Sequence, residues 1–480
     1  MVSIFFISLI MRFFLIHVMK KILLILCIGL CSIVNAQLIK IHDFDTLNNG
    51  IFPNGALISD GIFLFGVTLQ GGSYNKGIVF KVKPDGTSFT RLYDFNGING
   101  SSPRGELFFD GLFLYGTTTM GGTSDVGTVY KIKPDGTDFT KLHDFDTIGG
   151  IDPNGELFFD GVFLYGMTSE GGINNSGVIY KIKPDGTGFT KLHDFNTIDG
   201  SFPFFSFYSD GIFLYGSTVF GGINNEGTIF KIMPDGTGFV KLHDFNSLNG
   251  RYPNGTLVSD GFFLFGVTNS GGINGDGIIY KIMTNGSGFI KLHDFNFVDG
   301  NQPIGRLFYD GVLLIGTTWL GGTNSAGTIF KINTDGTNFI KLHDFEILNG
   351  RLPHGSFYSD GIFLYGITGN GGISNYCSNG CGTIFKFQLP VVSAKELSYK
   401  NNIEIYPNPS NSFFILKTKD LEGSTIKVYN LFGEVVFENV ITSTILKIDV
   451  NDLNIDGVYV LKIINNKTNE IISYRLVVTK

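Results

Sequence analysis

The chain has 480 residues, with 35 Lys and Arg against 42 Asp and Glu, which gives a formal charge of −7. Removal of a leader that carries three basic residues and no acid takes the charge from −7 to −10. So acidic a composition excludes a nucleic acid or an anionic membrane as partner, because phosphate groups need a basic surface. Aromatic residues make up 14% of the chain and Gly accounts for 66 residues, which is typical of many short strands joined by tight turns.

Residues 1–36 have the pattern of a secretory signal peptide. Lys20-Lys21 precede the apolar run 22–30, and Val34-Asn35-Ala36 supplies the small residues of a cleavage site. Residues 1–18 lie ahead of a second methionine, so they are either part of the leader or an over-extended start. Beyond the leader, no stretch of the sequence is long and apolar enough to span a bilayer. We therefore expect export through the periplasm to the outer-membrane cell surface or the medium.

Seven copies of a 50-residue unit fill residues 37–390. Each of the first six copies ends on a segment such as Lys-Leu-His-Asp-Phe at 191–195. The seventh copy stops before this segment, while a spare one stands at 40–44, ahead of the first copy. A ring closed by its own N-terminal strand produces this offset, and closure removes the exposed edge that an open array leaves for aggregation.

The third unit indicates how one copy folds. We predict strands over 156–159, 162–168, 178–183 and 189–195, because apolar runs there are separated by Asp-Gly and Pro-Asp-Gly turns and a Gly-rich loop. Four antiparallel strands in about 50 residues are typical of a propeller blade. The predicted fold is all-β: a seven-bladed β-propeller closed by an N-terminal strand at 38–44, followed by a small C-terminal β-sandwich.

The strand order predicts that one face of the ring carries the residues that differ between copies. Both Asp-Gly turns of a unit lie on one face, whereas the Gly-Gly loops and the segments that lead to the recurrent Pro lie on the other. Residues repeated in every copy are expected to be structural, so ligand contacts are expected where the copies differ. The residues predicted to bind a ligand are Trp319, Phe220, Phe204, Phe205, Tyr252, Arg251, Arg351 and His354. For Trp319, packing against a neighbouring blade is the alternative.

The repeated polar residues favour structural roles over catalysis or metal binding. Six of the eight histidines, such as His193 and His243, share a repeat position that Tyr93 fills in the first unit, and we interpret them as hydrogen-bond anchors for the following turn within a blade. Loops such as 274–277 are rich in Asn and Asp but lack the spacing of a calcium loop. Calcium therefore stays an open alternative, and no other metal or cofactor is expected. No nucleophile, zinc or paired-carboxylate spacing points to a catalytic residue.

Cys377 and Cys381 are the cysteines that remain after the leader, and both lie in an insertion in the last repeat. An oxidising compartment favours a disulfide between them. A metal or redox pair is the alternative, although no His stands beside them.

The repeat unit resembles a known family. Asp160 to Thr168, read as Asp-Gly-Val-Phe-Leu-Tyr-Gly-Met-Thr, together with Gly171-Gly172 and Asp185-Gly186-Thr187, resembles the GloVer-type (Gloeo/Verruco) tandem repeat of bacterial secreted proteins. The resemblance covers about 350 residues. It implies a surface or secreted propeller-like array with a variable anchoring tail, and it implies no established activity.

After a linker over 391–402, residues 403–480 lose the repeat and carry alternating strands. Their segments 403–410, 430–433, 457–461 and 475–480 resemble the type A sorting domain of the type IX secretion system of Bacteroidetes-type bacteria. The resemblance implies a small β-sandwich that directs export across the outer membrane and is then usually removed; a carbohydrate-binding sandwich is the alternative. It assigns the sorting signal to Tyr406, Pro407, Asn408, Pro409, Gly433, Gly457, Tyr459, Arg475 and Lys480.

Together these patterns predict a secreted or surface-displayed propeller, a monomer, that binds a glycan or a protein without catalysis and meets the type IX secretion machinery on its way out. An extracellular glycan hydrolase or lyase on the same scaffold is the rival hypothesis, and it requires an acidic pair that converges over the ring axis. A passive spacer in a surface layer is the third, and it predicts no pocket.

Overall fold

The computed structural model describes residues 38–45, 49–374, 376–388, 403–406, 410, 412–418, 421–429, 435–453, 457–464, 466 and 471–478. The predicted signal peptide 1–36 and linker 391–402 lie outside the described residues, as do Pro407, Asn408, Pro409, Gly433 and Lys480 of the predicted sorting signal. Within the described part the protein is all-β, and its strands pair in antiparallel sheets.

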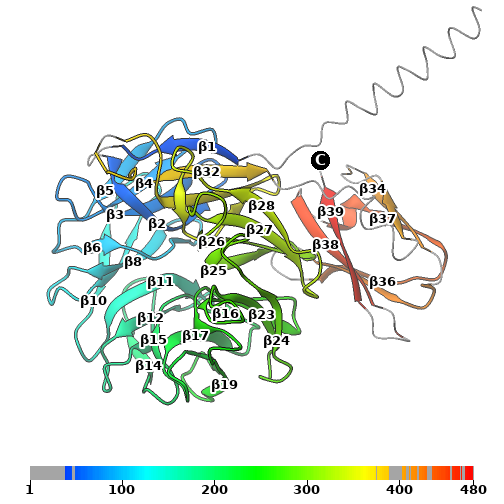
Figure 1. Cartoon of the computed structure of the whole chain (residues 1–480), viewed down its shortest axis with the longest axis horizontal. Coiled ribbons are helices and arrows are strands. Elements are labelled where there is room, and N and C mark those ends of the chain that lie inside the picture. Colours follow the sequence, from blue (N-terminus) through cyan, green and yellow to red (C-terminus); the bar gives the residue numbers. More distant parts are fainter. Residues whose placement is uncertain are drawn as a thin grey trace, which may run out of the picture.

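Seven small sheets follow one another along residues 38–388, each built mainly from one repeat (Figure 1). The first three are β2 (Ile51–Ser59), β3 (Leu64–Gln70), β4 (Ile78–Val82) and β5 (Thr90–Asp94); β6 (Ser101–Pro103), β7 (Phe108–Phe109), β8 (Leu114–Met120), β9 (Thr128–Ile132) and β10 (Thr140–Asp144); and β11 (Ile151–Phe159), β12 (Leu164–Glu170), β13 (Val178–Ile182) and β14 (Thr190–Asp194). The next three are β15 (Ser201–Pro203), β16 (Tyr208–Ser209), β17 (Leu214–Phe220), β18 (Thr228–Ile232) and β19 (Val240–Asp244); β20 (Arg251–Pro253), β21 (Val258–Ser259), β22 (Phe263–Ser270), β23 (Ile278–Met283) and β24 (Ile290–Asp294); and β25 (Asn301–Tyr309), β26 (Leu313–Leu320), β27 (Thr328–Asn333) and β28 (Ile340–Asp344).

The seventh sheet combines the two ends of the repeat array. It contains β29 (Arg351–Pro353), β30 (Tyr358–Ser359), β31 (Phe363–Asn370) and β32 (Thr383–Gln388), and its outer strand is β1 (Leu38–Asp43). β1 pairs antiparallel with β32, so that Leu38 lies opposite Phe387 and Asp43 opposite Thr383. The first sheet also packs on the last, through β2 and β31.

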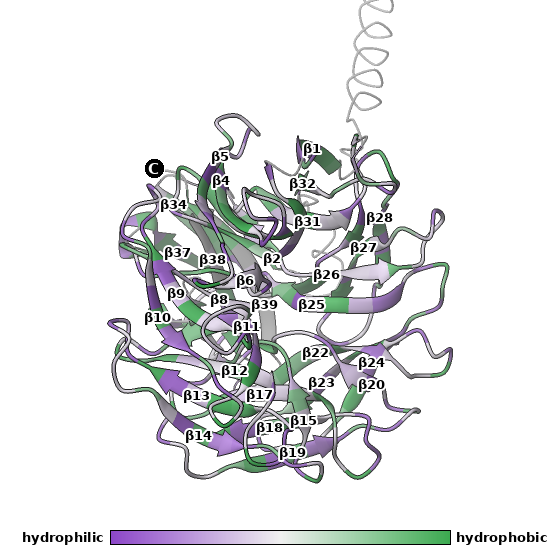
Figure 2. Cartoon of the chain, turned by 90° about the vertical axis from the view of Figure 1, so that its left-hand side faces the viewer, coloured by the Kyte–Doolittle hydropathy of each residue, from purple (hydrophilic) through white to green (hydrophobic). Residues whose placement is uncertain are grey.

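Hydrophobic residues fill the wedges between neighbouring sheets rather than one central core. In one wedge, Tyr165 and Ile179 of the third sheet pack against Leu214 and Phe230 of the fourth, and all four side chains are fully buried. Six further clusters of this kind join the other neighbouring sheets. Outer strands such as β14 and β19 carry mainly hydrophilic residues (Figure 2). Each sheet is therefore stabilised mainly by its two neighbours.

The first strand of a unit begins earlier than the sequence indicates. β11 starts at Ile151, five residues before the predicted start at residue 156, and pairs Pro153 with Thr168 of β12. Pro153-Asn154-Gly155 resembles a turn, but Gly155 adopts a φ of +86° and the register shifts beyond Asn154, so the strand bends without ending. Pro is tolerated because this strand is the inner edge of its sheet. The earlier start of β11 places residues 154–156 on the inner strand of the sheet.

Five of the six repeated histidines, all except His343, join neighbouring sheets by stacking on a Phe ring. His193 at the end of β14 stacks on Phe239 of the next repeat, with centroids 4.0 Å apart and planes 6° from parallel. Tyr93 stacks in the same way on Phe139 at 3.7 Å and also hydrogen-bonds Asn99. The predicted hydrogen bond from the ring to the following turn is present at His243 and His293. The prediction placed the role of the histidines within one blade and did not include their stacking on the next repeat. Burial lowers the pKa of His243 to about 4, so the stacked ring is neutral at neutral pH.

The C-terminal region forms two sheets that share one core. One contains β33 (Glu404–Tyr406), β34 (Phe413–Lys417) and β37 (Ile445–Asp449); the other contains β35 (Thr425–Tyr429), β36 (Val435–Val440), β38 (Gly457–Ile464) and β39 (Ile471–Val478). A short 3₁₀ helix, Val450–Leu453, precedes β38, and the Tyr459 hydroxyl donates a hydrogen bond to the Leu453 carbonyl. Buried side chains such as Phe414 and Leu461 belong to a single cluster. Of the predicted sorting residues, Gly457 and Tyr459 lie on β38, Arg475 on β39, and Tyr406 ends β33.

Candidate ligand-binding pocket

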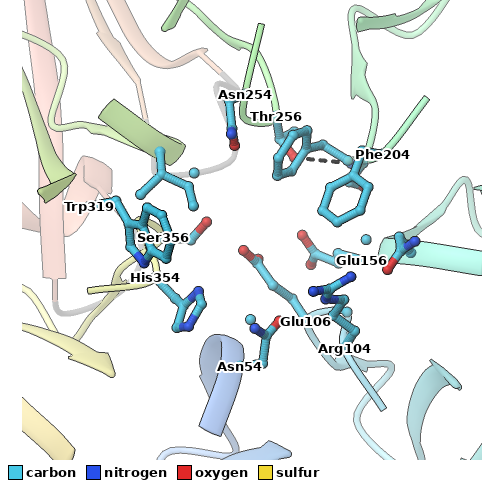
Figure 3. Close-up of a pocket in the computed structure, with 18 of the residues that line it drawn as sticks. Asn54, Arg104, Glu106, Glu156, Phe204, Asn254, Thr256, Trp319, His354 and Ser356 are labelled. Atoms are coloured by element: carbon cyan, nitrogen blue, oxygen red, sulfur yellow. Dashed lines mark hydrogen bonds between the residues drawn. The ribbon is translucent and has the colours of Figure 1, made fainter. Parts of the chain in front are cut away.

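All seven repeats contribute to one pocket where their innermost strands meet (Figure 3). Its volume is about 400 Å³, within the size range of small-ligand sites. The wall is formed by one repeat position that carries Asn54, Arg104, Asn154, Phe204, Asn254, Ile304 and His354. The frame around the pocket is repeated, whereas the side chains that face into it differ.

Glycines next to the wall residues bring the inner strands together. A Cβ on Gly105 would lie 2.2 Å from the carbonyl oxygen of Gly155, and one on Gly255 would lie 2.1 Å from that of Gly305. Such distances leave no room for a side chain, so neighbouring backbones touch around the pocket. The fourth repeat has Phe205 at this position, and its ring lies 5.0 Å from that of Phe204.

A cluster of charged side chains lies beside the wall. Arg306 Nη1 is 3.1 Å from Glu156 Oε2, and Arg306 Nη2 is 3.4 Å from Glu106 Oε2. The Glu side chains are 17% and 18% exposed. The three residues occupy the same position in the second, third and sixth repeats, so one guanidinium joins two carboxylates across the ring.

Two carboxylates against one cation leave this cluster short of positive charge. Burial raises the pKa of Glu156 to about 7; Arg306 opposes the rise, and the hydrogen bond and negative charge of Glu106 add to it. Near neutral pH Glu156 is therefore protonated part of the time and can then donate a hydrogen bond to Glu106. The cluster becomes more negative as the pH rises.

Two of the asparagines that line the pocket carry a buried oxygen without a hydrogen-bond partner among the described residues. The Asn154 amide donates to the Asp152 carbonyl at 3.0 Å and to Ser169 Oγ at 2.8 Å, but its Oδ1 has no hydrogen-bond partner among the described residues, although only 3% of Asn154 is exposed. Asn254 Oδ1 also lacks a hydrogen-bond partner in the part of the chain that the structure describes. A buried acceptor without a partner is costly. Less than 1 Å² of each oxygen is accessible, so a ligand donor reaches these acceptors only when the Asn side chains turn toward the pocket.

His354 is held neutral at the wall. Burial and the nearby Arg104 guanidinium lower its pKa to about 4. Its ring lies over Gly369, where an added Cβ would come within 2.5 Å of Nε2. The glycine thereby makes room for the imidazole, which at neutral pH has both a donor and an acceptor nitrogen.

The structure places four of the eight residues predicted to bind a ligand in the pocket lining and three others beside one another outside it. Trp319, Phe204, Phe205 and His354 line the pocket, and Trp319 and Phe204 lie on opposite sides of it in Figure 3. Phe220, Arg251 and Tyr252 lie next to one another outside the lining, since the Phe220 and Tyr252 rings are 5.1 Å apart. Arg351 is placed elsewhere, opposite Asn370 in the seventh sheet, and does not line the pocket.

Sequence reasoning missed the glutamates and the asparagines of the pocket. Glu106 and Glu156 each stand in an alternating strand pattern, where a charge is read as solvent-facing. The available signal was one repeat position that carries Ala, two Ser, Thr, two Glu and one Arg in the seven copies. Opposite charges at one ring position meet when the inner strands converge. Asn54, Asn154 and Asn254 were missed because an Asn that recurs before Gly is typical of a turn.

Within the described residues, no group of three or more His, Cys, Asp or Glu side chains is placed to hold a metal ion. Cys377 and Cys381 form a disulfide in the insertion of the seventh repeat. Neither feature adds a reactive group to the pocket.

Most of the repeat region matches a known family. The Gloeobacter/Verrucomicrobia repeat matches residues 109–263, 204–379 and 258–425, well over half of the chain. The chain belongs to this repeat family. A second family, the secretion system C-terminal sorting domain, matches residues 404–479. This repeat-family protein is therefore exported by the type IX secretion system to the cell surface or the medium, and the described residues include no helix of sufficient length and apolarity to cross a membrane.

Solved structures give distant likenesses to this repeat-family protein. PorZ, a surface component of the type IX secretion system of Porphyromonas gingivalis, is 13% identical, with a TM-score of 0.45 over 90% of this chain. The chain spans 60% of the length of PorZ. An oligogalacturonate lyase from Vibrio parahaemolyticus is 12% identical, with a TM-score of 0.46 over 75% of this chain and 98% of the lyase. No curated protein matches the chain in sequence.

Proposed function

We propose that this exported protein is a non-enzymatic glycan-binding module whose ligand enters the pocket shared by the seven repeats. The observation that carries the proposal is the pocket itself, in which the rings of Trp319 and Phe204 lie on opposite sides and the acceptors of Asn154 and Asn254 lack partners. An aromatic face binds the C–H face of a sugar, and amide and guanidinium groups bind its hydroxyls. A protein ligand fits less well, because a pocket of about 400 Å³ admits only a small part of a protein surface.

The proposed architecture is supported by the pairing of the first and last strands and by the sequence patterns. We take residues 37–390 as a seven-bladed propeller that β1 closes by pairing with β32, residues 391–402 as a linker and residues 403–480 as the sorting domain, with a signal peptide at 1–36. Closure matters for binding, because the wall residues of the first and last repeats, Asn54 and His354, line the same pocket.

The acidic pair is the observation that favours a hydrolase, and its geometry argues against one. Glu106 and Glu156 are close enough to hydrogen-bond each other, and both are held by Arg306. The two acids of a glycosidase stand about 5 to 9.5 Å apart on either side of the bond that is cleaved. A pair whose members hydrogen-bond each other and share one guanidinium has no room for a glycosidic oxygen and a water between its members. We therefore assign the glutamates to structure and to ligand hydrogen bonding.

Binding of the full exported chain to an array of defined glycans tests the proposal. We expect at least one glycan to bind, and Trp319→Ala to weaken its binding at least tenfold, the loss expected when a stacking contact of about 1.4 kcal/mol is removed. Arg351→Ala is the matched control, because Arg351 lies outside the pocket lining, and it should bind like the unchanged chain. Glycan binding that survives Trp319→Ala would place the site elsewhere, and an array without any bound glycan would refute the proposed ligand class.

A further inference from the structure

Five aromatic rings form a continuous track from the pocket outward along the fourth and fifth repeats. The track is defined by Phe205, Phe204, Phe202, Phe220 and Tyr252. Consecutive ring centroids are 5.0 Å apart for Phe205 and Phe204, 6.0 Å for Phe204 and Phe202, 5.8 Å for Phe202 and Phe220, and 5.1 Å for Phe220 and Tyr252. The first two rings line the pocket. The track is therefore an extension of the proposed binding site.

The track is a departure from the repeat rather than part of it. Phe204, Phe205 and Phe220 are each the only Phe, Tyr or Trp at their repeat position, and Gly stands at the position of Phe205 in the other six copies. Phe202 and Tyr252 share one repeat position, which carries Phe52, Ser102, Asp152, Gln302 and Leu352 in the other copies. Phe220 is 37% exposed, and the other four side chains are partly exposed. Aromatic side chains that replace non-aromatic ones in most copies and stay partly open to solvent are not needed for packing.

The backbone holds two of these rings rigidly. Phe202 and Tyr252 have φ angles of 60° and 59°, a region that bulky residues seldom occupy. Hydrogen bonds between repeats fix this conformation, from Phe202 N to the Ser176 carbonyl at 3.0 Å and from Tyr252 N to the Glu226 carbonyl at 2.8 Å. Rings on a fixed backbone lose little conformational entropy on binding.

The outer end of the track offers hydrogen-bonding groups. The Arg251 guanidinium lies over the Tyr252 ring, 4.5 Å from its centroid, and hydrogen-bonds the Tyr252 hydroxyl. Arg251 Nε also lies 3.5 Å from Glu226 Oε1. Rings with donors and acceptors beside them suit a chain of sugars, which presents apolar ring faces and polar edges in alternation.

A peptide is a weaker candidate for the same surface. Peptides that bind β-proteins in extended form add a strand to an open sheet edge. Here neighbouring repeats cover one another's inner edges: Gly305 N donates to the Asn254 carbonyl at 3.0 Å, and Arg306 N donates to Ser356 Oγ at 3.1 Å. The acidic net charge excludes a nucleic acid strand.

We infer that the ligand is a linear oligosaccharide bound by one end, with its terminal sugar in the pocket and the following sugars stacked along the aromatic track. This inference rests on the proposed glycan-binding function and adds the length and direction of the ligand to it. It makes Phe220 and Tyr252 determinants of chain length, whereas Trp319 determines whether any sugar binds.

A length series on the full exported chain tests the inference. The probes are neutral linear oligosaccharides of one to six units from several polysaccharides, with affinity measured by calorimetry. We expect affinity to rise from one to about four units and then to level off. Phe220→Ala with Tyr252→Ala should weaken binding of the four-unit probe about tenfold for each ring removed and leave the one-unit probe within about twofold.

Matched controls and failures separate the two proposals. Met120→Ala with Leu352→Ala removes side chains at the corresponding positions of other repeats, and it should leave the length dependence intact. Thermal unfolding identifies any variant that fails to fold. Affinity that is already maximal for one unit, or a length dependence that survives loss of Phe220 and Tyr252, overturns the track while the pocket assignment stands. Absence of binding at every length overturns both.

Discussion

Replacement of Glu156 by Gln is expected to remove a pH-dependent loss of stability that the cluster with Glu106 and Arg306 imposes. Burial raises the pKa of Glu156 from 4.5 to about 7. A carboxyl group whose folded pKa is raised stabilises the fold below its unfolded pKa, and this stability is lost as the pH rises through the folded pKa. Ionisation of Glu156 should therefore destabilise the wild-type protein between about pH 4.5 and about pH 7.

The size of the effect follows from the two pKa values. The difference between 4.5 and about 7, at about 1.36 kcal/mol for each pKa unit, gives up to about 3 kcal/mol. The 18% exposure of Glu156 makes this an upper limit. With an unfolding entropy of about 2.1 cal/mol/K per residue over about 350 residues, 3 kcal/mol corresponds to about 4 °C in Tm. In Glu156→Gln the amide stays neutral, and Arg306 is left with one carboxylate.

The assay is the Tm of both proteins, measured by calorimetry from pH 5 to pH 8.5. We expect the Tm of Glu156→Gln minus that of the wild type to grow by up to about 4 °C across this range. Glu170→Gln, which changes an exposed carboxylate of the same repeat, should show no such growth. Arg306→Met supplies the opposite case, because it leaves two carboxylates without their cation and should cost about 3 to 5 kcal/mol at pH 8. Parallel Tm curves for Glu156→Gln and the wild type would refute the raised pKa of Glu156.

Three further outcomes are expected. Gly369→Ala should weaken glycan binding by displacing His354, whose Nε2 would meet the new Cβ at 2.5 Å, while Tm falls little; equal affinity by calorimetry would contradict the placement of His354. His243→Tyr should fold, because Tyr93 occupies the same repeat position with an equivalent Asn partner. His243→Tyr should also remove a loss of stability in acid of up to about 3 kcal/mol, because burial lowers the folded pKa of His243 from 6.5 to about 4. His243 stabilises the fold above pH 6.5, and this contribution is lost as the pH falls toward 4. Urea unfolding at pH 7 and at pH 4.5 measures the difference. Deletion of residues 403–480 should leave the exported chain in the periplasm, and normal surface display of the truncated chain, detected by antibody labelling of intact cells, would refute the sorting role.

The regular parts of the fold could be predicted because they depend on local chemistry. Asp-Gly turns and apolar alternation placed β12, β13 and β14 to within two residues at each end. β11 was misplaced because Pro153-Asn154-Gly155 has the composition of a turn, and only the pairing of Pro153 with Thr168 keeps it in the sheet. That pairing depends on a neighbouring strand, which local sequence does not report.

The candidate site could be predicted only in part, for a related reason. Differences between repeats identified Trp319, Phe204 and His354, because each is conspicuous against six other copies. Glu106, Glu156 and Arg306 are up to 200 residues apart in the chain, and their meeting depends on how closely the inner strands converge. The stacking of His193 on Phe239 was missed likewise, because it joins two repeats.

The pocket wall also determines the orientation of whatever it holds. Seven identical side chains on seven equivalent strands would offer a ligand seven rotated poses of equal energy. That degeneracy would favour binding by RT ln 7, about 1.2 kcal/mol, but would leave no defined direction. With Arg104, Phe204, Ile304 and His354 among the asparagines, the poses differ in energy, and a single one can dominate. Because each wall residue stands on its own copy of the frame, one substitution can select a different pose without disturbing the six other strands.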